Sequence, residues 1–192
     1  CYAAVADGAI FRCEGATIRA LHTPGHTPDH VVFTLEEEGS MFAGDCVLNG
    51  NTATFEDLGE YTESLRRMAQ ELPAGGTLYP SHGDVVTDGT GKLAEYLRHR
   101  AMREEMFMDA LREDWNTRPE RGGMTASELC HAVYARQVSY LVLKTACEGI
   151  TRQHLGKMTE EGRVRVEGGK GGWGFWGEVR YVPSAGEMAR AR

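Results

Sequence analysis

Three side chains that can bind a metal ion, His26, Asp45 and His82, each follow a segment that is typical of a β-strand. His26 lies in the loop "TPGHT", Asp45 ends "MFAGD", and His82 follows the short strand of "TLYPSHGD". Ligands at the ends of different strands can form a site along one edge of a sheet. Imidazole and carboxylate together suit zinc, and manganese or iron less well. Taken singly, each residue also has a structural explanation, as a polar loop residue, a turn former or a helix cap.

The stretch "LHTPGHTPDH" places three histidines, His22, His26 and His30, four residues apart. On a helix this spacing would align the imidazoles, but Pro24 and Pro28 each lack an N–H and disfavour helical backbone before them. Alternating apolar residues on both sides predict strands. The stretch is therefore expected to be a loop between two strands, in which the histidines need not converge on one ion.

The first part of the chain predicts strands with few helices. Residues 9–23 are expected to form a hairpin that turns at Glu14–Gly15, and residues 30–48 a second hairpin that turns near Gly39. Asp57 is placed to cap an amphipathic helix. The inner face of that helix is expected to hold Leu58, Tyr61, Leu65, Met68 and Leu72. A long helix is predicted over 92–115, with Leu93, Leu97, Ala101, Met108 and Leu111 on its inner face.

The last third of the chain has the pattern of three helices and a hairpin. Thr125 and Glu128 in "TASE" form a capping box. Helices are expected over 126–135, 138–147 and 151–161, followed by a hairpin with a glycine-rich tip, which is the plan of a winged helix. The expected fold class is α+β, with domain boundaries at 1–92, 93–122 (a connecting helix and linker) and 123–192.

Charge is distributed unevenly between the two parts. Residues 1–92 hold 5 Lys+Arg against 14 Asp+Glu, and residues 93–192 hold 16 against 14, within a net charge of −7. Only the second part could attract a polyanion, although a mildly charged surface explains its composition equally well. The five scattered cysteines favour reduced thiols in an intracellular compartment. We find no apolar run long enough to span a bilayer and no signal peptide.

The motifs "TPGHT", "GDCVLNG" and "PSHGD", in this order and at these intervals, resemble the second half of the metallo-β-lactamase superfamily. The resemblance implies two zinc ions: His26 would bind one, Asp45 would bridge both, and His82 would bind the other. His30 is expected to have a structural or orienting role near the site, and His22 to be exposed. The remaining histidines are expected at the surface or at a boundary; these are His99, His131 and His154.

The segment "FEDL" and the winged helix narrow the resemblance to the lactamase-beta-like protein 2 group, which implies a phosphodiesterase or endoribonuclease on single-stranded RNA. RNA contacts would then come from the hairpin tip, at Lys170, Trp173, Phe175 and Trp176. These aromatic residues could instead pack under the wing. Two other functions stay open: hydrolysis of acyl carrier, coenzyme A or glutathione thioesters, and a catalytically incomplete fragment or binding partner.

The superfamily signature H-x-H-x-D-H, which supplies four of the seven usual ligands, does not occur in these 192 residues. The sequence therefore resembles the C-terminal part of an αββα sandwich followed by a winged helix. We expect this chain alone to be inactive and to require the missing N-terminal half of the domain, or a homodimer partner. The expected location is intracellular, in the mitochondrial matrix or the cytoplasm, with no membrane partner.

Overall fold

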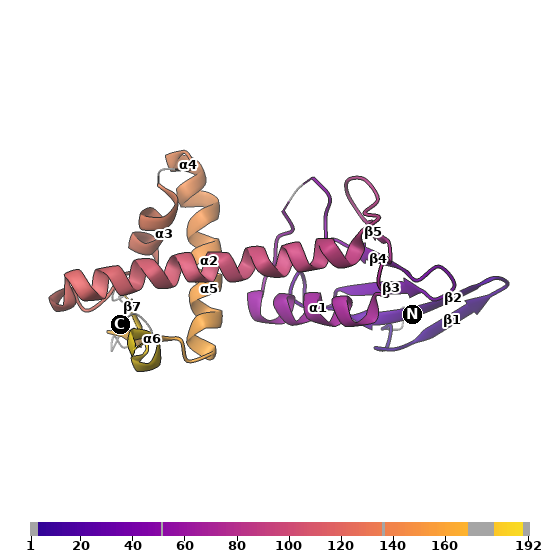
Figure 1. The fold of residues 1–192 in the computed structure, drawn as a ribbon, viewed down its shortest axis with the longest axis horizontal. Coiled ribbons are helices and arrows are strands. Elements are labelled where there is room, and N and C mark those ends of the chain that lie inside the picture. The colour runs from indigo at the N-terminus through magenta and orange to yellow at the C-terminus, as the bar shows by residue number, and fades with distance from the viewer. Residues whose placement is uncertain (1–3, 51, 136, 169–178, 190–192) are drawn as a thin grey trace. The chain divides into compact units, whose positions relative to one another are not determined.

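A computed structural model describes residues 4–50, 52–135, 137–168 and 179–189 (Figure 1). The chain divides into two compact units, Cys1–Arg100 and Ala101–Arg192. No helix of the described residues is long and apolar enough to cross a membrane.

The first unit contains a five-stranded sheet in the order β1-β2-β3-β4-β5. The strands are β1 (Ile10–Cys13), β2 (Ala16–His22), β3 (Val31–Leu35), β4 (Ser40–Gly44) and β5 (Leu78–Pro80). The pairs from β1 to β4 are antiparallel, which confirms both predicted hairpins, and β4 pairs with β5 in parallel. Strands β2, β4 and β5 therefore run in the same direction, so their carboxyl ends lie at one edge.

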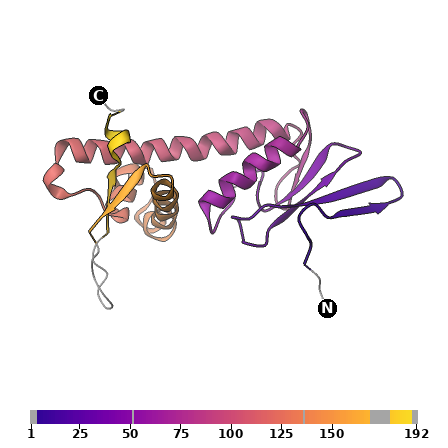
Figure 2. The ribbon, with the colours of Figure 1, turned by 90° about the horizontal axis from the view of Figure 1, so that it is seen from below.

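Helix α1 (Leu58–Glu71) covers one face of this sheet (Figure 2). The Asp57 carboxylate accepts a hydrogen bond from the Glu60 N–H at 2.8 Å, which caps the helix as predicted. The inner face of α1 packs on buried residues of the strands, such as Met41 and Leu78. All five residues predicted for this face are buried: Leu58, Tyr61, Leu65, Met68 and Leu72.

Helix α2 (Gly89–Thr117) begins three residues before the prediction and ends two after it. The Asp88 carboxylate accepts a hydrogen bond from the Gly91 N–H at 2.9 Å and stabilises this first turn. The sequence does not predict the turn, because its glycines have a weak helix propensity. Leu93 is buried in the core of the first unit as predicted, whereas Ala101 is exposed. An alanine is compatible with either environment, so its type does not define the inner face.

The other face of the sheet carries a cross-strand stack of two aromatic rings. Phe42 of β4 and Tyr79 of β5 are register partners, and their ring centroids lie 5.2 Å apart. Phe42 remains 42% exposed, although its neighbours Met41 and Ala43 on the other face are fully buried. Among the described residues, the apolar surface is thus buried mainly on the α1 side.

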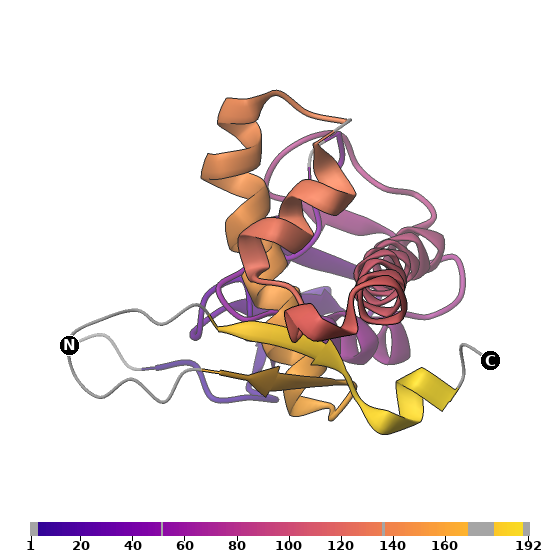
Figure 3. The same ribbon diagram turned by 90° about the vertical axis from the view of Figure 1, so that its left-hand side faces the viewer.

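The second unit contains the predicted helices and hairpin (Figure 3). Its elements are η1 (Pro119–Arg121), α3 (Ala126–Tyr134), α4 (Tyr140–Val142), the π-helical segment η2 (Leu143–Cys147), α5 (Glu148–Glu160), β6 (Val164–Glu167), β7 (Arg180–Pro183) and α6 (Ala185–Ala189). The capping box at Thr125 and Glu128 is present. The two helices predicted over 138–147 and 151–161 are instead one continuous run, because the π-helical segment joins α4 to α5 without a break.

His154 contradicts the prediction of a surface or boundary residue, since it is fully buried on α5. Its ring packs on Phe107 with centroids 5.3 Å apart, and its Nδ1 lies 3.9 Å from Glu104 Oε1. Glu104 also accepts from Lys157 Nζ at 2.8 Å and from Arg163 Nη1 at 2.9 Å. His99 and His131 are exposed as expected.

Candidate metal centre

The three predicted ligands meet at the edge where β2, β4 and β5 end. His26 Nε2 lies 3.8 Å from Asp45 Oδ2, and His82 Nε2 lies 3.6 Å from Asp45 Oδ1. The side chains of His26, Asp45 and His82 are 19%, 39% and 70% exposed, so the group opens to solvent on the His82 side. Each imidazole faces a different oxygen of the same carboxylate.

His26 is oriented by a second contact on the far side of its ring. Its Nδ1 lies 2.8 Å from the carbonyl oxygen of Thr54, so this nitrogen donates its proton to that oxygen. In the neutral imidazole, Nε2 then carries the lone pair and faces Asp45. Metal-binding histidines are commonly fixed in this way, with the other ring nitrogen bonded to a carbonyl or carboxylate.

The Asp45 carboxylate has an unfilled acceptor position. Its Oδ1 is buried and has no hydrogen-bond partner within the described part of the chain. A buried carboxylate oxygen without a donor is unfavourable unless a cation or water satisfies it. The donor types and this open position fit a divalent metal ion. In their present positions, however, no three His, Cys, Asp or Glu side chains of the described residues are grouped to hold a single ion.

Glycines allow the loops of the site to approach closely. Gly25 has φ of 115°, and a Cβ there would lie 2.1 Å from the backbone nitrogen of Tyr61. Gly83 has φ of 90°, and a Cβ there would lie 1.9 Å from the Asn49 carbonyl oxygen. Both positions therefore require glycine, because a side chain would be strained and would collide with backbone.

Backbone hydrogen bonds fasten the loop that carries His82. The Ser81 N–H donates to the Gly44 carbonyl at 3.0 Å, and the Asn49 N–H donates to the His82 carbonyl at 3.3 Å. The loops after β4 and β5 are thus joined on both sides of His82. This explains how a largely exposed histidine keeps its place beside Asp45.

His30 lies next to the candidate ligands without facing the carboxylate. Its Nδ1 is 2.9 Å from the Thr23 hydroxyl, and its ring meets the ring of His26 edge-on at 5.5 Å. Burial, followed by the proximity of His26, lowers the pKa of His30 below its usual value. A neutral His30 avoids placing a positive charge beside the ions that the site would hold.

The other candidate residues do not join this group. His22 is exposed, and its Nε2 contacts the Pro28 carbonyl at 2.9 Å. The predicted RNA contacts lie outside the described residues; they are Lys170, Trp173, Phe175 and Trp176. Sequence reasoning missed Thr54 and Thr23, which position His26 and His30, because a contact through a backbone carbonyl or a hydroxyl has no sequence signature.

Two family patterns match the chain. Residues 4–86 match the metallo-beta-lactamase superfamily, and residues 125–173 match the beta-lactamase associated winged helix domain. The chain therefore contains a metallo-beta-lactamase superfamily domain followed by the winged helix domain associated with it. This confirms the predicted α+β fold class and the resemblance to this superfamily with an appended winged helix.

Two curated relatives of the chain are named as thioesterases, whereas the sequence analysis expected a ribonuclease. The chain is 40% identical over 179 residues to the atrochrysone carboxyl ACP thioesterase AgnL7 of Paecilomyces divaricatus, covering 92% of the chain and 56% of that protein. It is 43% identical over 163 residues to an atrochrysone carboxyl ACP thioesterase of Aspergillus chevalieri, covering 85% of the chain and 52% of that protein. The chain thus spans about half the length of the curated relatives it matches.

The prediction of an endoribonuclease on single-stranded RNA is wrong, because these relatives are named thioesterases. A superfamily fold accommodates several hydrolytic reactions, so the shared motifs do not identify the substrate. Among solved structures, a metallo-beta-lactamase family protein of Thermus thermophilus matches with 26% identity and a TM-score of 0.67, over 93% of the chain and 53% of that protein.

Proposed function

We propose that this chain contributes the His26, Asp45 and His82 side of a metal centre in a thioester hydrolase that acts on acyl groups carried by an acyl carrier protein. The convergence of both imidazoles on the Asp45 carboxylate supports the metal centre. The two relatives named as carrier-protein thioesterases support the substrate class.

In this proposal His26, Asp45 and His82 would together hold the zinc ions. When bound, the ions polarise the thioester carbonyl and lower the pKa of water to about 7. His26 keeps its Nδ1 proton on the Thr54 carbonyl, so its Nε2 remains available. The exposed side of the group, at His82, is where a substrate would enter.

Thioester hydrolysis suits a site built from ligands rather than from side-chain acids. The leaving thiolate has a conjugate acid with a pKa of roughly 8.5, as for cysteine, so it can depart without a proton donor. The carbonyl oxygen needs positive charge near it in the transition state. A metal centre held by His26, Asp45 and His82 would supply this positive charge. The thiolate would leave without a proton donor from the protein.

We further propose that the ligands of the H-x-H-x-D-H motif come from outside these 192 residues. The exposed Phe42 on the sheet face opposite α1 supports this, because it offers apolar surface on which a further layer could pack. A preceding segment and a second polypeptide would both satisfy the proposal. This chain alone would then bind zinc weakly and hydrolyse nothing.

The test measures thiol release from an acyl-pantetheine and from an acyl carrier protein. The chain is assayed alone and after fusion behind the part of the Paecilomyces divaricatus relative that precedes the matched region. We expect zinc-dependent release only from the fusion, with loss in Asp45→Asn and retention in the control His22→Gln. Release that survives Asp45→Asn would overturn the assignment of the centre. A zinc-loaded fusion without release from either substrate would overturn the thioesterase function.

A further inference from the structure

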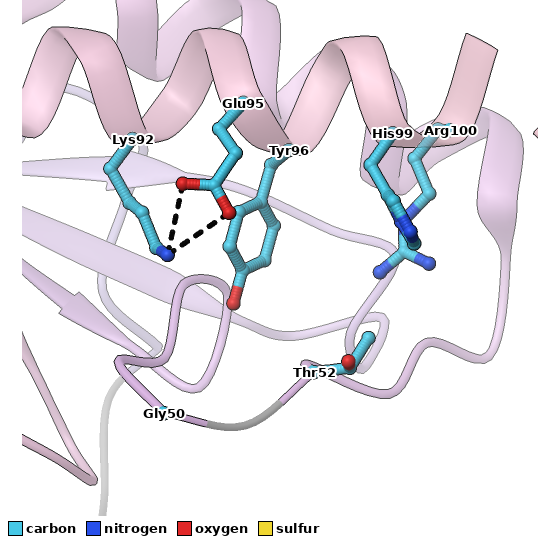
Figure 4. Close-up of a pocket in the computed structure, with 7 residues that line it drawn as sticks. All are labelled: Gly50, Thr52, Lys92, Glu95, Tyr96, His99 and Arg100. Atoms are coloured by element: carbon cyan, nitrogen blue, oxygen red, sulfur yellow. Dashed lines mark hydrogen bonds and ion pairs between the residues drawn. The ribbon is translucent and has the colours of Figure 1, made fainter. Parts of the chain in front are cut away.

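A pocket of about 270 Å³ lies between the first turns of α2 and the loop that follows Asp45. Figure 4 shows Lys92 and Arg100 reaching from α2 towards the loop positions Gly50 and Thr52, with the Tyr96 ring between them. Arg100 is eight positions after Lys92, so these two lining residues lie about 12 Å apart along the helix axis. Glu95 and His99 complete the lining.

Arg100 is buried in an unusual environment for a guanidinium group. The residue is only 5% exposed, and its guanidinium carbon lies 4.9 Å from the ring centroid of Phe55 and 5.6 Å from that of Tyr61. Its Nη2 makes a long hydrogen bond of 3.4 Å to the Ala53 carbonyl, and its Nε has no partner among the described residues. No carboxylate of the described residues lies within 4 Å of it.

Three other cations of this unit have acidic partners. Arg19 pairs with Glu71 at 2.8 Å, Arg67 pairs with Asp7 at 3.0 Å, and Lys92 pairs with Glu95 at 3.1 Å within the pocket itself. The Glu95 carboxylate therefore balances Lys92 and leaves the charge of Arg100 uncompensated. A buried charge is unfavourable unless it is paired, so this position favours an anion from outside the described chain.

The pocket and the candidate metal centre share a wall. The Ala53 carbonyl accepts from Arg100, and the next carbonyl along the chain, of Thr54, accepts from His26. A ligand on Arg100 would therefore lie behind the loop segment that orients His26. A substrate that reaches the metal ions could extend along this loop into the pocket.

We propose that this pocket binds a phosphate ester through Arg100 and, resting on the proposed function, that the ester is the phosphate of the substrate's pantetheine arm. Arg100 lines the pocket, and its planar guanidinium fork matches two phosphate oxygens. The phosphate is the charged group of that arm, so it is the part that a buried cation can recognise. The Thr52 side chain lies at the other wall of the pocket.

The experiment measures equilibrium binding of three probes by calorimetry: 4′-phosphopantetheine, pantetheine and inorganic phosphate. The wild-type chain is compared with Arg100→Met and with the matched control Arg98→Met, which removes the same charge from an exposed position of the same helix. We expect 4′-phosphopantetheine to bind at least about tenfold more tightly than pantetheine, consistent with a charge-assisted pair. Arg100→Met should bind 4′-phosphopantetheine and pantetheine with equal affinity, and Arg98→Met should keep the tenfold difference.

Equal affinity for 4′-phosphopantetheine and pantetheine, or an unchanged ratio in Arg100→Met, would overturn the proposal. Inorganic phosphate that binds as tightly as 4′-phosphopantetheine would overturn the pantetheine assignment and leave a free-anion pocket. If Arg100→Met does not fold, Arg100→Lys keeps the charge without the fork and should reduce the ratio. None of these measurements requires hydrolysis, so failure of the thioesterase function and failure of the pocket are distinguishable.

Discussion

His30 Nε2 lies 2.7 Å from the position that a Cβ on residue 44 would occupy. Gly44 has φ of 54°, in the left-handed region, and it immediately precedes Asp45. The close approach of His30 and the sharp turn after β4 therefore depend on the same glycine. This relationship sets the direction in which the Asp45 carboxylate leaves the sheet.

Gly44→Ala should lower the free energy of unfolding by about 1–3 kcal/mol, because backbone strain and a collision with His30 combine. Zinc affinity should fall as well, since Asp45 would be displaced. The control is Gly15→Ala, which also has a positive φ (80°) but has nothing within 4 Å of the added Cβ. Urea unfolding followed by circular dichroism compares the two, and an equal loss in both would show that the His30 contact contributes nothing.

Asp45→Asn should weaken zinc binding by about tenfold or more, equivalent to about 1.4 kcal/mol per tenfold. An amide is neutral and cannot bridge two ions as a carboxylate does. His22→Gln, four residues from His26 but bonded to the Pro28 carbonyl, should leave the affinity unchanged. Calorimetric zinc titration of both variants provides the measurement. A larger loss in His22→Gln than in Asp45→Asn would place the ion elsewhere.

Two cysteines near the sheet should differ in reactivity. Burial raises the pKa of the Cys46 thiol to about 12, whereas Cys13 is exposed in β1. At pH 8 and under native conditions, iodoacetamide should label Cys13 and spare Cys46, because only the thiolate reacts. Peptide mapping by mass spectrometry measures both sites, with a urea-unfolded sample as the control. Equal labelling in the native chain would contradict the burial of Cys46.

The winged-helix unit should lose stability in acid through Glu187. Burial opposes ionisation of this carboxyl group, but hydrogen bonds from Arg163 and Arg112 outweigh it and lower the pKa below 4.5. A lowered pKa gives stability that is present above the unfolded-state pKa and is lost as pH falls through the folded-state pKa.

Glu187→Gln should therefore destabilise the chain at pH 7 by about 3 kcal/mol, the usual effect of removing one partner of a buried pair. The difference from the wild type should shrink as the pH falls from the unfolded-state pKa of a glutamate towards the lower folded-state pKa of Glu187, because the wild-type carboxyl then becomes protonated. Thermal unfolding at several pH values measures this difference. A constant difference from pH 7 to pH 3 would contradict the role of the charge.

Much of the fold could be predicted because its signals are local. The alternation around Glu14–Gly15, the Asp57 cap and the Thr125 capping box each depend on a few neighbouring residues, and each is present. The proximity of His26, Asp45 and His82 could be predicted because each residue follows a strand that ends at the same edge of the sheet. The family resemblance selected these three residues from the seven histidines and the many carboxylates.

The errors arise where long-range packing decides. His154 is buried because Phe107 and Glu104, about fifty residues earlier, lie against it. The joining of α4 and α5 depends on a π-helical segment, which has no reliable sequence signal. The substrate class could not be read from the motifs, since they specify metal ligands. The environment of Arg100 combines α2 with the loop at Ala53, so a linear pattern cannot reveal it.

The most direct test of the metal centre is long-range ¹⁵N–¹H NMR of the histidine side chains during zinc titration. We predict that Nε2 of His26 and Nε2 of His82 shift, that Nδ1 of His26 keeps its proton on the Thr54 carbonyl, and that His22 and His131 do not change. Zinc-dependent shifts confined to His22 or His131, or loss of the Nδ1 proton of His26, would contradict the assignment of the centre.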